Sequence, residues 1–142
     1  MKNMKLFLRQ VLGCECPDEV LNHIESASGI PLDNGIILRN RINVGNRLLV
    51  YVVTADSVDF VKETLPWLVI AGKDERDGKG FNRFRLVLAS DDRKGLEEVA
   101  ERAFNALPER DEKVHLHVVG KSALSLLEGN AQESSQPPPV RI

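Results

Sequence analysis

The chain has 142 residues, of which 42% are hydrophobic and 28% charged, and its formal net charge is −2 at pH 7. This is about the length of one domain, with the composition of an ordinary globular protein. The small net charge gives no reason to expect nucleic acid or an anionic membrane as a partner. No apolar run reaches the roughly 20 residues that a membrane-spanning helix needs.

The N-terminal segment does not have the pattern of a secretory signal peptide. Its apolar stretch is interrupted at Arg9 and Gln10, and no small-residue cleavage site follows. We therefore expect a cytoplasmic protein, in which thiols stay reduced.

Residues 1–29 are predicted to form a helical hairpin. The second helix begins at Pro17, a residue that suits the first helical position. The apolar stripe of the first helix consists of Met4, Phe7, Leu8, Val11 and Leu12. The buried side of the second consists of Val20, Leu21, Ile24 and Ala27.

The hydrophobic period changes to that of a strand at Ile36. Apolar and polar residues alternate over 36–44, which predicts a strand at an edge of the sheet. Gly45 and Asn46 follow, and glycine in the first position favours a type II′ hairpin turn. The run from Leu48 to Val53 is apolar on both faces, as expected of a central strand.

Two later stretches share one pattern. Residues 46–56 and 82–91 each contain an apolar strand that ends in small or acidic residues and leads into a helix. The first predicted helix ends before Pro66, and the second ends before Pro108. Another apolar run follows each helix, at 67–71 and at 114–119, so the pattern predicts two βαβ units in series.

The resulting order, β-α-β-β-α-β over about residues 47–119, is similar to the ferredoxin-like split βαβ fold. The sequence thus predicts an α+β protein with an antiparallel sheet, an extra N-terminal strand and the preceding helical hairpin. In the alternative interpretation, Pro66 only kinks one long helix from Asp56 to Ala71, within a three-layer α/β arrangement. Element order of this kind hosts many unrelated functions and assigns none by itself.

The last residues of the chain differ in composition from the rest. After a short predicted helix over 121–127, residues 129–142 are polar and include three consecutive prolines. Such a segment cannot bury an apolar core, so we predict a disordered tail that could also bind a protein partner. Residues 1–128 then form a single domain, with the hairpin at 1–29 and the sheet with its helices at 36–119.

Cys14 and Cys16 are the only cysteines, and one residue separates them at the predicted junction of two helices. Two sulfurs at this spacing can bind one metal ion or form a disulfide that is easily reduced. The N-terminus of the second helix favours a thiolate at Cys16, whereas the neighbouring carboxylates oppose one. In the alternative interpretation, both thiols only fill space between the helices.

The chain contains three histidines. His115 and His117 alternate with apolar residues and therefore project from one face of the last predicted strand. With two thiolates they would complete a tetrahedral site for a soft metal such as zinc, although zinc-finger ligand spacing is absent. His23 lies about two turns after Cys16 on the second predicted helix. The candidate metal ligands are thus Cys14, Cys16, His23, His115 and His117, and the alternative places the strand histidines on a solvent-exposed face.

Two groups of basic residues suggest anion binding. A glycine-rich loop is predicted over 72–83, where backbone amides and basic side chains could hold a phosphate or carboxylate. In the alternative interpretation, it is only a long solvated hairpin loop. Its candidate anion-binding residues are Lys73, Arg76, Lys79 and Arg83. A further set, Arg39, Arg41, Arg47, Arg83 and Arg85, could form a basic sheet face that binds RNA. Stacking aromatics are scarce. We prefer the alternative that the first two helices cover this face, because Leu49, Tyr51 and Val53 would otherwise be exposed.

No catalytic motif is recognisable, and the sequence leaves open whether the protein is an enzyme. The motifs favour a thiol-based function of Cys14 and Cys16, either binding of a soft metal or a redox-responsive accessory role. A second interpretation is a non-enzymatic interaction module that assembles through its sheet, for example as a homodimer, with inert cysteines. A third is binding of a small anion at the 72–83 loop.

Overall fold

The computed structural model describes residues 2–14, 17–32, 35–108 and 111–127. A five-stranded sheet forms its centre, with the strands in the order β1-β2-β3-β4-β5. The first three strands pair antiparallel, and β3, β4 and β5 run parallel. The strands are Ile24–Pro31, Ile37–Val44, Leu48–Thr54, Arg83–Ser90 and Val114–Gly120. The predicted α+β class, with a five-stranded sheet, is confirmed.

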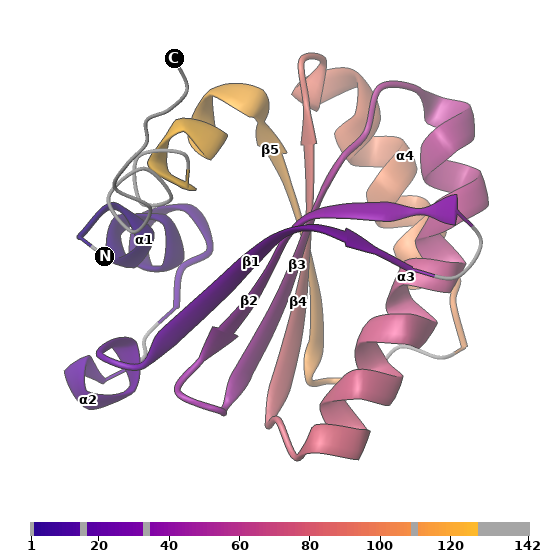
Figure 1. Ribbon diagram of the computed structural model, residues 1–142. Helices are drawn as coiled ribbons and strands as arrows, with labels where there is room; N and C mark the ends of the chain where they lie inside the picture. The colour runs from indigo at the N-terminus through magenta and orange to yellow at the C-terminus, as the bar shows by residue number, and fades with distance from the viewer. Residues whose placement is uncertain (1, 15–16, 33–34, 109–110, 128–142) are drawn as a thin grey trace.

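Helices lie on both faces of this sheet (Figure 1). The parallel strands require crossover connections, which α3 (Val58–Lys79) and α4 (Arg93–Asn105) supply on one face. The short helix α1 (Lys2–Leu6), the π-helix η1 (Phe7–Val11) and the 3-10 helix η3 (Lys121–Leu124) lie on the other. A single-turn helix, α2 (Asp18–Leu21), precedes β1. None of the helices in the described ranges has the length and apolar content that crossing a membrane requires.

The strand predicted over 67–71 is wrong, because these residues belong to the interior of α3. Leu65, Leu68, Val69 and Gly72 are buried at helical spacing, whereas Trp67 is 53% exposed, so the run does not suit a central strand. Pro66 lies within the helix, as in the alternative interpretation, and α3 continues past Ala71 to Lys79. The connections are therefore β3-α3-β4-α4-β5, and the ferredoxin-like order is not confirmed.

The glycine-rich loop predicted over 72–83 is wrong for the same reason. The helix continues to Lys79 and ends at Gly80, whose left-handed backbone (φ 80°) caps it. Gly72 lies inside the helix, where a Cβ atom would overlap the ring of Phe84 on β4.

The second helix of the predicted hairpin is also shorter than expected. It ends at Leu21, and the residues from Ile24 onward pair with β2 instead. This strand is at the edge of the sheet and mostly exposed, so it shows no alternating pattern. The strand expected at the edge, 36–44, has a partner on each side. Gly45 and Asn46 both have positive φ (59° each), which makes the turn type I′ rather than type II′.

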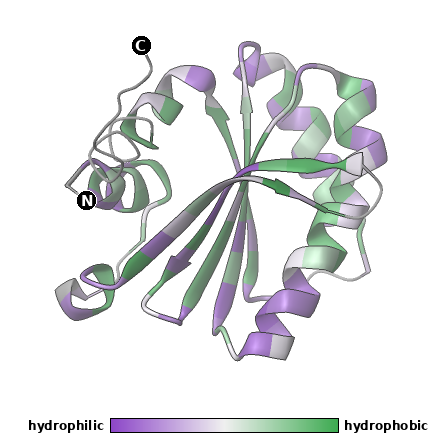
Figure 2. Ribbon diagram, in the orientation of Figure 1, coloured by the Kyte–Doolittle hydropathy of each residue, from purple (hydrophilic) through white to green (hydrophobic). Residues whose placement is uncertain are grey.

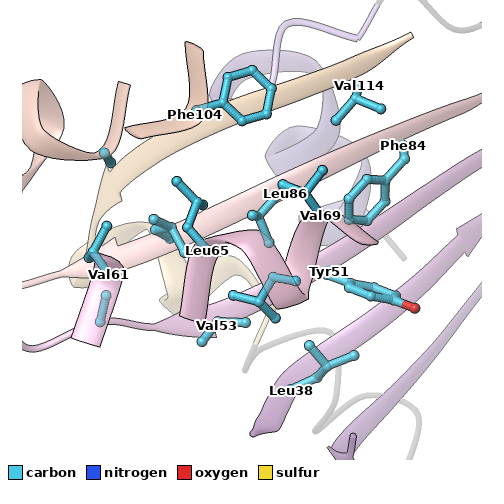
Figure 3. Close-up of a cluster of buried hydrophobic side chains, with 14 of the residues drawn as sticks. Leu38, Tyr51, Val53, Val61, Leu65, Val69, Phe84, Leu86, Phe104 and Val114 are labelled. Carbon is cyan, nitrogen blue, oxygen red and sulfur yellow. The ribbon is translucent and has the colours of Figure 1, made fainter. Parts of the chain in front are cut away.

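Two hydrophobic clusters, one on each face of the sheet, hold these layers together. Figure 2 shows apolar residues along the strands and hydrophilic residues on the C-terminal turns of α3. The cluster under α3 and α4 contains Tyr51, Leu65, Phe84 and Phe104 (Figure 3). The cluster on the opposite face contains most of the predicted N-terminal stripe together with residues from α2, from β1 to β4 and from the η3 region. The tail predicted over 129–142 lies outside the described residues.

Candidate functional site

The segment that follows η1 brings Cys14 against the sheet. Gly13 has a positive φ (68°) and turns the chain, and the Cys14 amide donates to the Leu8 carbonyl at 2.9 Å. Cys14 is only 7% exposed and belongs to the cluster that contains Phe7 and Leu8. Its sulfur is disulfide-bonded. Cys16 lies outside the described residues.

Arg85 on β4 connects this segment with the strand histidines. Its Nη1 donates to the Leu12 carbonyl at 2.8 Å and lies 2.9 Å from Nε2 of His117 on β5. A guanidinium can only donate, so Nε2 is the acceptor and the proton of the neutral imidazole is on Nδ1. The cysteine segment and the histidine strand are thus close together, with a cation between them.

Burial and positive charge act together on the ionisable groups of this face. The pKa of His117 falls to about 4, first through burial and then through the charge of Arg85, so the imidazole is neutral at pH 7. The same causes lower the pKa of His115. Burial, followed by the charge of Arg83, lowers the pKa of Arg85 itself. Arg83 and Arg85 thus place positive charge on this face, beside the two histidines.

A pocket of about 380 Å³ opens beside Cys14. Three of its lining residues are arginines: Arg47 from the β2–β3 turn, and Arg83 and Arg85, which alternate along β4 and so share its face. The Arg47 carbonyl accepts hydrogen bonds from the amides of Asn82 and Arg83, at 2.8 and 3.1 Å, which fixes the turn beside β4. The rest of the lining is Gly13, Cys14, Pro17, Val20, Leu48 and Asn82.

The five arginines singled out from the sequence do not share one face. Arg41 pairs with Glu75 of α3, on the helix-covered face, where the Tyr51 hydroxyl donates to the same carboxylate at 2.5 Å. Arg83 and Arg85 lie on the opposite face, in register with Leu48 and Val50 of β3. Sequence reasoning identified these side chains, but the faces they occupy depend on strand register.

The candidate metal ligands are only partly brought together. His115 and His117 share one face of β5, as predicted, and His117 approaches the cysteine segment through Arg85. His23 is exposed and lines a separate pocket with Asn22 and Asn43. Among the residues that the structure describes, no group of three or more histidine, cysteine, aspartate and glutamate side chains could hold a metal ion.

The four candidate anion ligands of the 72–83 segment do not converge. Arg76 is 6% exposed and binds Asp111 through both terminal nitrogens, Nη1 and Nη2, at 3.0 and 2.8 Å. Lys79 pairs with Glu75 at 3.1 Å, one turn back along α3. Arg83 instead lines the pocket beside Cys14, on the other face of the sheet.

Sequence reasoning missed a polar cluster at the carboxyl ends of the parallel strands. Lys121, which follows β5, lies 3.1 Å from Asp56 and 3.5 Å from Asp91, the residues shortly after β3 and β4. Its pKa is raised, first by the hydrogen bond to Asp56. The small or acidic residues that end both strands were the available signal.

No protein-family model matches this chain, and neither does any curated protein or solved structure.

Proposed function

We propose that the protein has a redox-responsive accessory role, in which Cys14 and Cys16 alternate between a disulfide and two thiols. The observation that carries this proposal is the disulfide-bonded sulfur of Cys14. With one residue between them, the two α-carbons can be about 7 Å apart at most, near the upper end of disulfide geometry. A disulfide at this spacing is strained, and strained disulfides are the easily reduced ones.

The segment that contains Cys14 contacts both η1 and Arg85, so a redox change at Cys14 can alter its neighbours. Cys14 lies in the connection between η1 and α2, and its amide is bonded to η1 at Leu8. Two residues earlier, the Leu12 carbonyl accepts the Arg85 hydrogen bond. Opening the disulfide would relax a segment that both lines the pocket and holds Arg85.

Two observations favour a redox-responsive role of the cysteines over metal binding. A sulfur in a disulfide has no thiolate to offer a metal. The acceptor nitrogen of His117 already receives the Arg85 hydrogen bond, and the guanidinium would repel a metal cation. A metal ion would therefore have to displace Arg85 before it could reach His117.

The test compares hydrogen–deuterium exchange of oxidised and reduced protein. We expect reduction to increase exchange over residues 8–21 and to leave α4 unchanged. The variant with both Cys14→Ser and Cys16→Ser provides the matched control, because it should fold and show no response to reductant. Equal exchange in the two redox states would show that the cysteines are inert. Stoichiometric binding of zinc to the reduced protein would favour metal binding instead.

A second candidate function is assembly through β1. This strand is an edge of the sheet, and residues 25–29 are exposed with Glu25 as their single charge. Edges are usually protected by lysine, proline or bulges. The only proline of β1 is its last residue, Pro31, so the part over residues 25–28 is open to pairing with another strand, such as β1 of a second copy. Analytical ultracentrifugation should then show a dimer that Ala27→Lys dissociates and Gln10→Lys, on η1, does not. A monomeric wild-type protein would eliminate this candidate.

A further inference from the structure

We propose that the pocket lined by Arg47, Arg83 and Arg85 binds a small molecule that carries a phosphate group. This inference does not rest on the redox role of Cys14, because the three arginines belong to the β2–β3 turn and to β4 and not to the cysteine segment.

The arginines of the pocket have no carboxylate partner among the residues that the structure describes. Within the described residues, its lining contains no carboxylate, and the side chains of Arg47 and Arg83 form neither an ion pair nor a hydrogen bond. Elsewhere in the described chain, arginines such as Arg41, Arg76 and Arg102 are paired with carboxylates. In a chain with 21 acidic and 19 basic residues, acidic partners are available, so this exception indicates an anion from outside.

Arg85 is held in place for such a ligand. Its Nη1 is bonded to the Leu12 carbonyl and lies against His117 Nε2, which fixes the orientation of the planar guanidinium. Within the described structure, its other terminal nitrogen, Nη2, forms no hydrogen bond. A donor that is already oriented loses little conformational entropy on binding.

Phosphate matches this arrangement better than a single carboxylate. Three guanidinium groups carry more positive charge than one carboxylate can neutralise, which favours a dianion, and their planar forks suit the oxygens of a phosphate. The volume of about 380 Å³ exceeds what a bare phosphate fills and lies at the lower end of the range for small-molecule pockets. Pro17, Val20 and Leu48 provide an apolar wall for the body of the ligand, and the Asn82 amide can orient it.

The lining does not suit recognition of single-stranded nucleic acid. Such recognition relies on aromatic side chains that stack on bases, and no aromatic residue lines this pocket in the described part of the chain. Tyr51, the aromatic residue of β3, is 2% exposed and packs on the opposite face.

Calorimetric titration with inorganic phosphate, pyrophosphate and adenosine monophosphate tests the proposal. We expect saturable binding of at least one phosphate probe. Arg83→Gln should weaken binding by about tenfold to a hundredfold, as the loss of a charge-assisted hydrogen bond does, and adding Arg47→Gln should abolish it. The matched control is Arg102→Gln, which removes the same charge from α4 and should bind like the wild type.

Arg85 is not replaced in this test, because its structural contacts would confuse a loss of binding with a loss of folding. Circular dichroism of each variant establishes that it is folded. The proposal is overturned if no probe binds, if binding survives Arg47→Gln with Arg83→Gln, or if Arg102→Gln weakens it equally. An oligonucleotide that binds more tightly as its length increases would also overturn it, in favour of nucleic acid. Binding that persists in both redox states supports it, even if the redox role fails.

Discussion

Gly72 is the point of closest approach between α3 and the sheet, and replacing it with alanine tests the packing directly. A Cβ atom built on Gly72 overlaps three atoms of the Phe84 ring. That ring is fully buried and cannot move aside freely, because it packs edge-on against Tyr51 with 4.9 Å between ring centroids. Figure 3 shows both rings within the cluster of buried side chains beneath the helices.

The expected effect is the difference between two opposing contributions. Alanine is a better helix former than glycine, which alone would stabilise the protein by about 1 kcal/mol. Forcing Phe84 or α3 to move costs about 1–3 kcal/mol, and the loss of the aromatic contact costs about 0.5–1.5 kcal/mol more. We therefore expect Gly72→Ala to lower the free energy of unfolding by roughly 1–3 kcal/mol, or on the order of 5–10 °C in Tm.

Gly78→Ala is the matched control, because Gly78 belongs to the same helix and a Cβ there meets no atom within 4 Å. It should raise the free energy of unfolding by about 0.5–1 kcal/mol. Urea and thermal unfolding should be followed by far-UV circular dichroism, because Trp67 is already 53% exposed and its fluorescence would respond weakly. A Gly72→Ala protein as stable as the wild type would refute the close packing of α3 on β4.

Two further predictions concern acid stability. Asp111, held by the Arg76 hydrogen bonds, has its pKa lowered to about 2, so its stabilising contribution is present above about pH 4 and lost as the pH falls toward 2. Because Asp111 is 35% exposed, we expect Asp111→Asn to lower the free energy of unfolding by only about 1 kcal/mol at neutral pH. In urea unfolding, the stability of this variant should fall less steeply than that of the wild type between pH 4 and pH 2. His117 has a folded pKa of about 4 against 6.5 when unfolded, so the unfolded chain binds more protons between these values and stability falls as the pH falls from 6.5 to 4. His117→Gln should remove this loss of about 2 kcal/mol in the free energy of unfolding, measured by urea unfolding at the two pH values. A variant whose stability falls with pH as steeply as that of the wild type would contradict the buried neutral imidazole.

The sequence was most informative where one face of an element is buried. The alternation over 36–44 predicted β2, and the amphipathic series after Asp92 predicted α4. In α3, the proline and glycine signals suggested a strand and a loop, but tertiary packing prevailed over both. Pro66 is accommodated within the helix, and Gly72 is required by the Phe84 ring rather than by a turn. β1 lacked a signal because its exposed residues carry no alternation.

The site was less predictable than the fold, because it depends on contacts between distant segments. The sequence predicted Arg76 as a ligand for an external anion. Its partner is instead a carboxylate of the chain, which lies 35 positions away in the α4–β5 connection. The opposite placements of Arg41 and Arg85 follow from strand register, which local sequence does not encode. The approach of the Cys14 segment to His117 depends on Arg85, whose partners are Leu12, directly after η1, and His117 of β5.

The redox state of Cys14 is the central claim, and equilibration in glutathione buffers tests it most directly. Protein held at a series of ratios of reduced to oxidised glutathione is alkylated, and its intact mass is measured without reductant. The proposal predicts two populations, whose proportions shift across the series. In one, both thiols are alkylated. The other is unalkylated, and its mass is two hydrogen atoms below that of the reduced, unmodified protein. Two alkylated thiols at every ratio would contradict it.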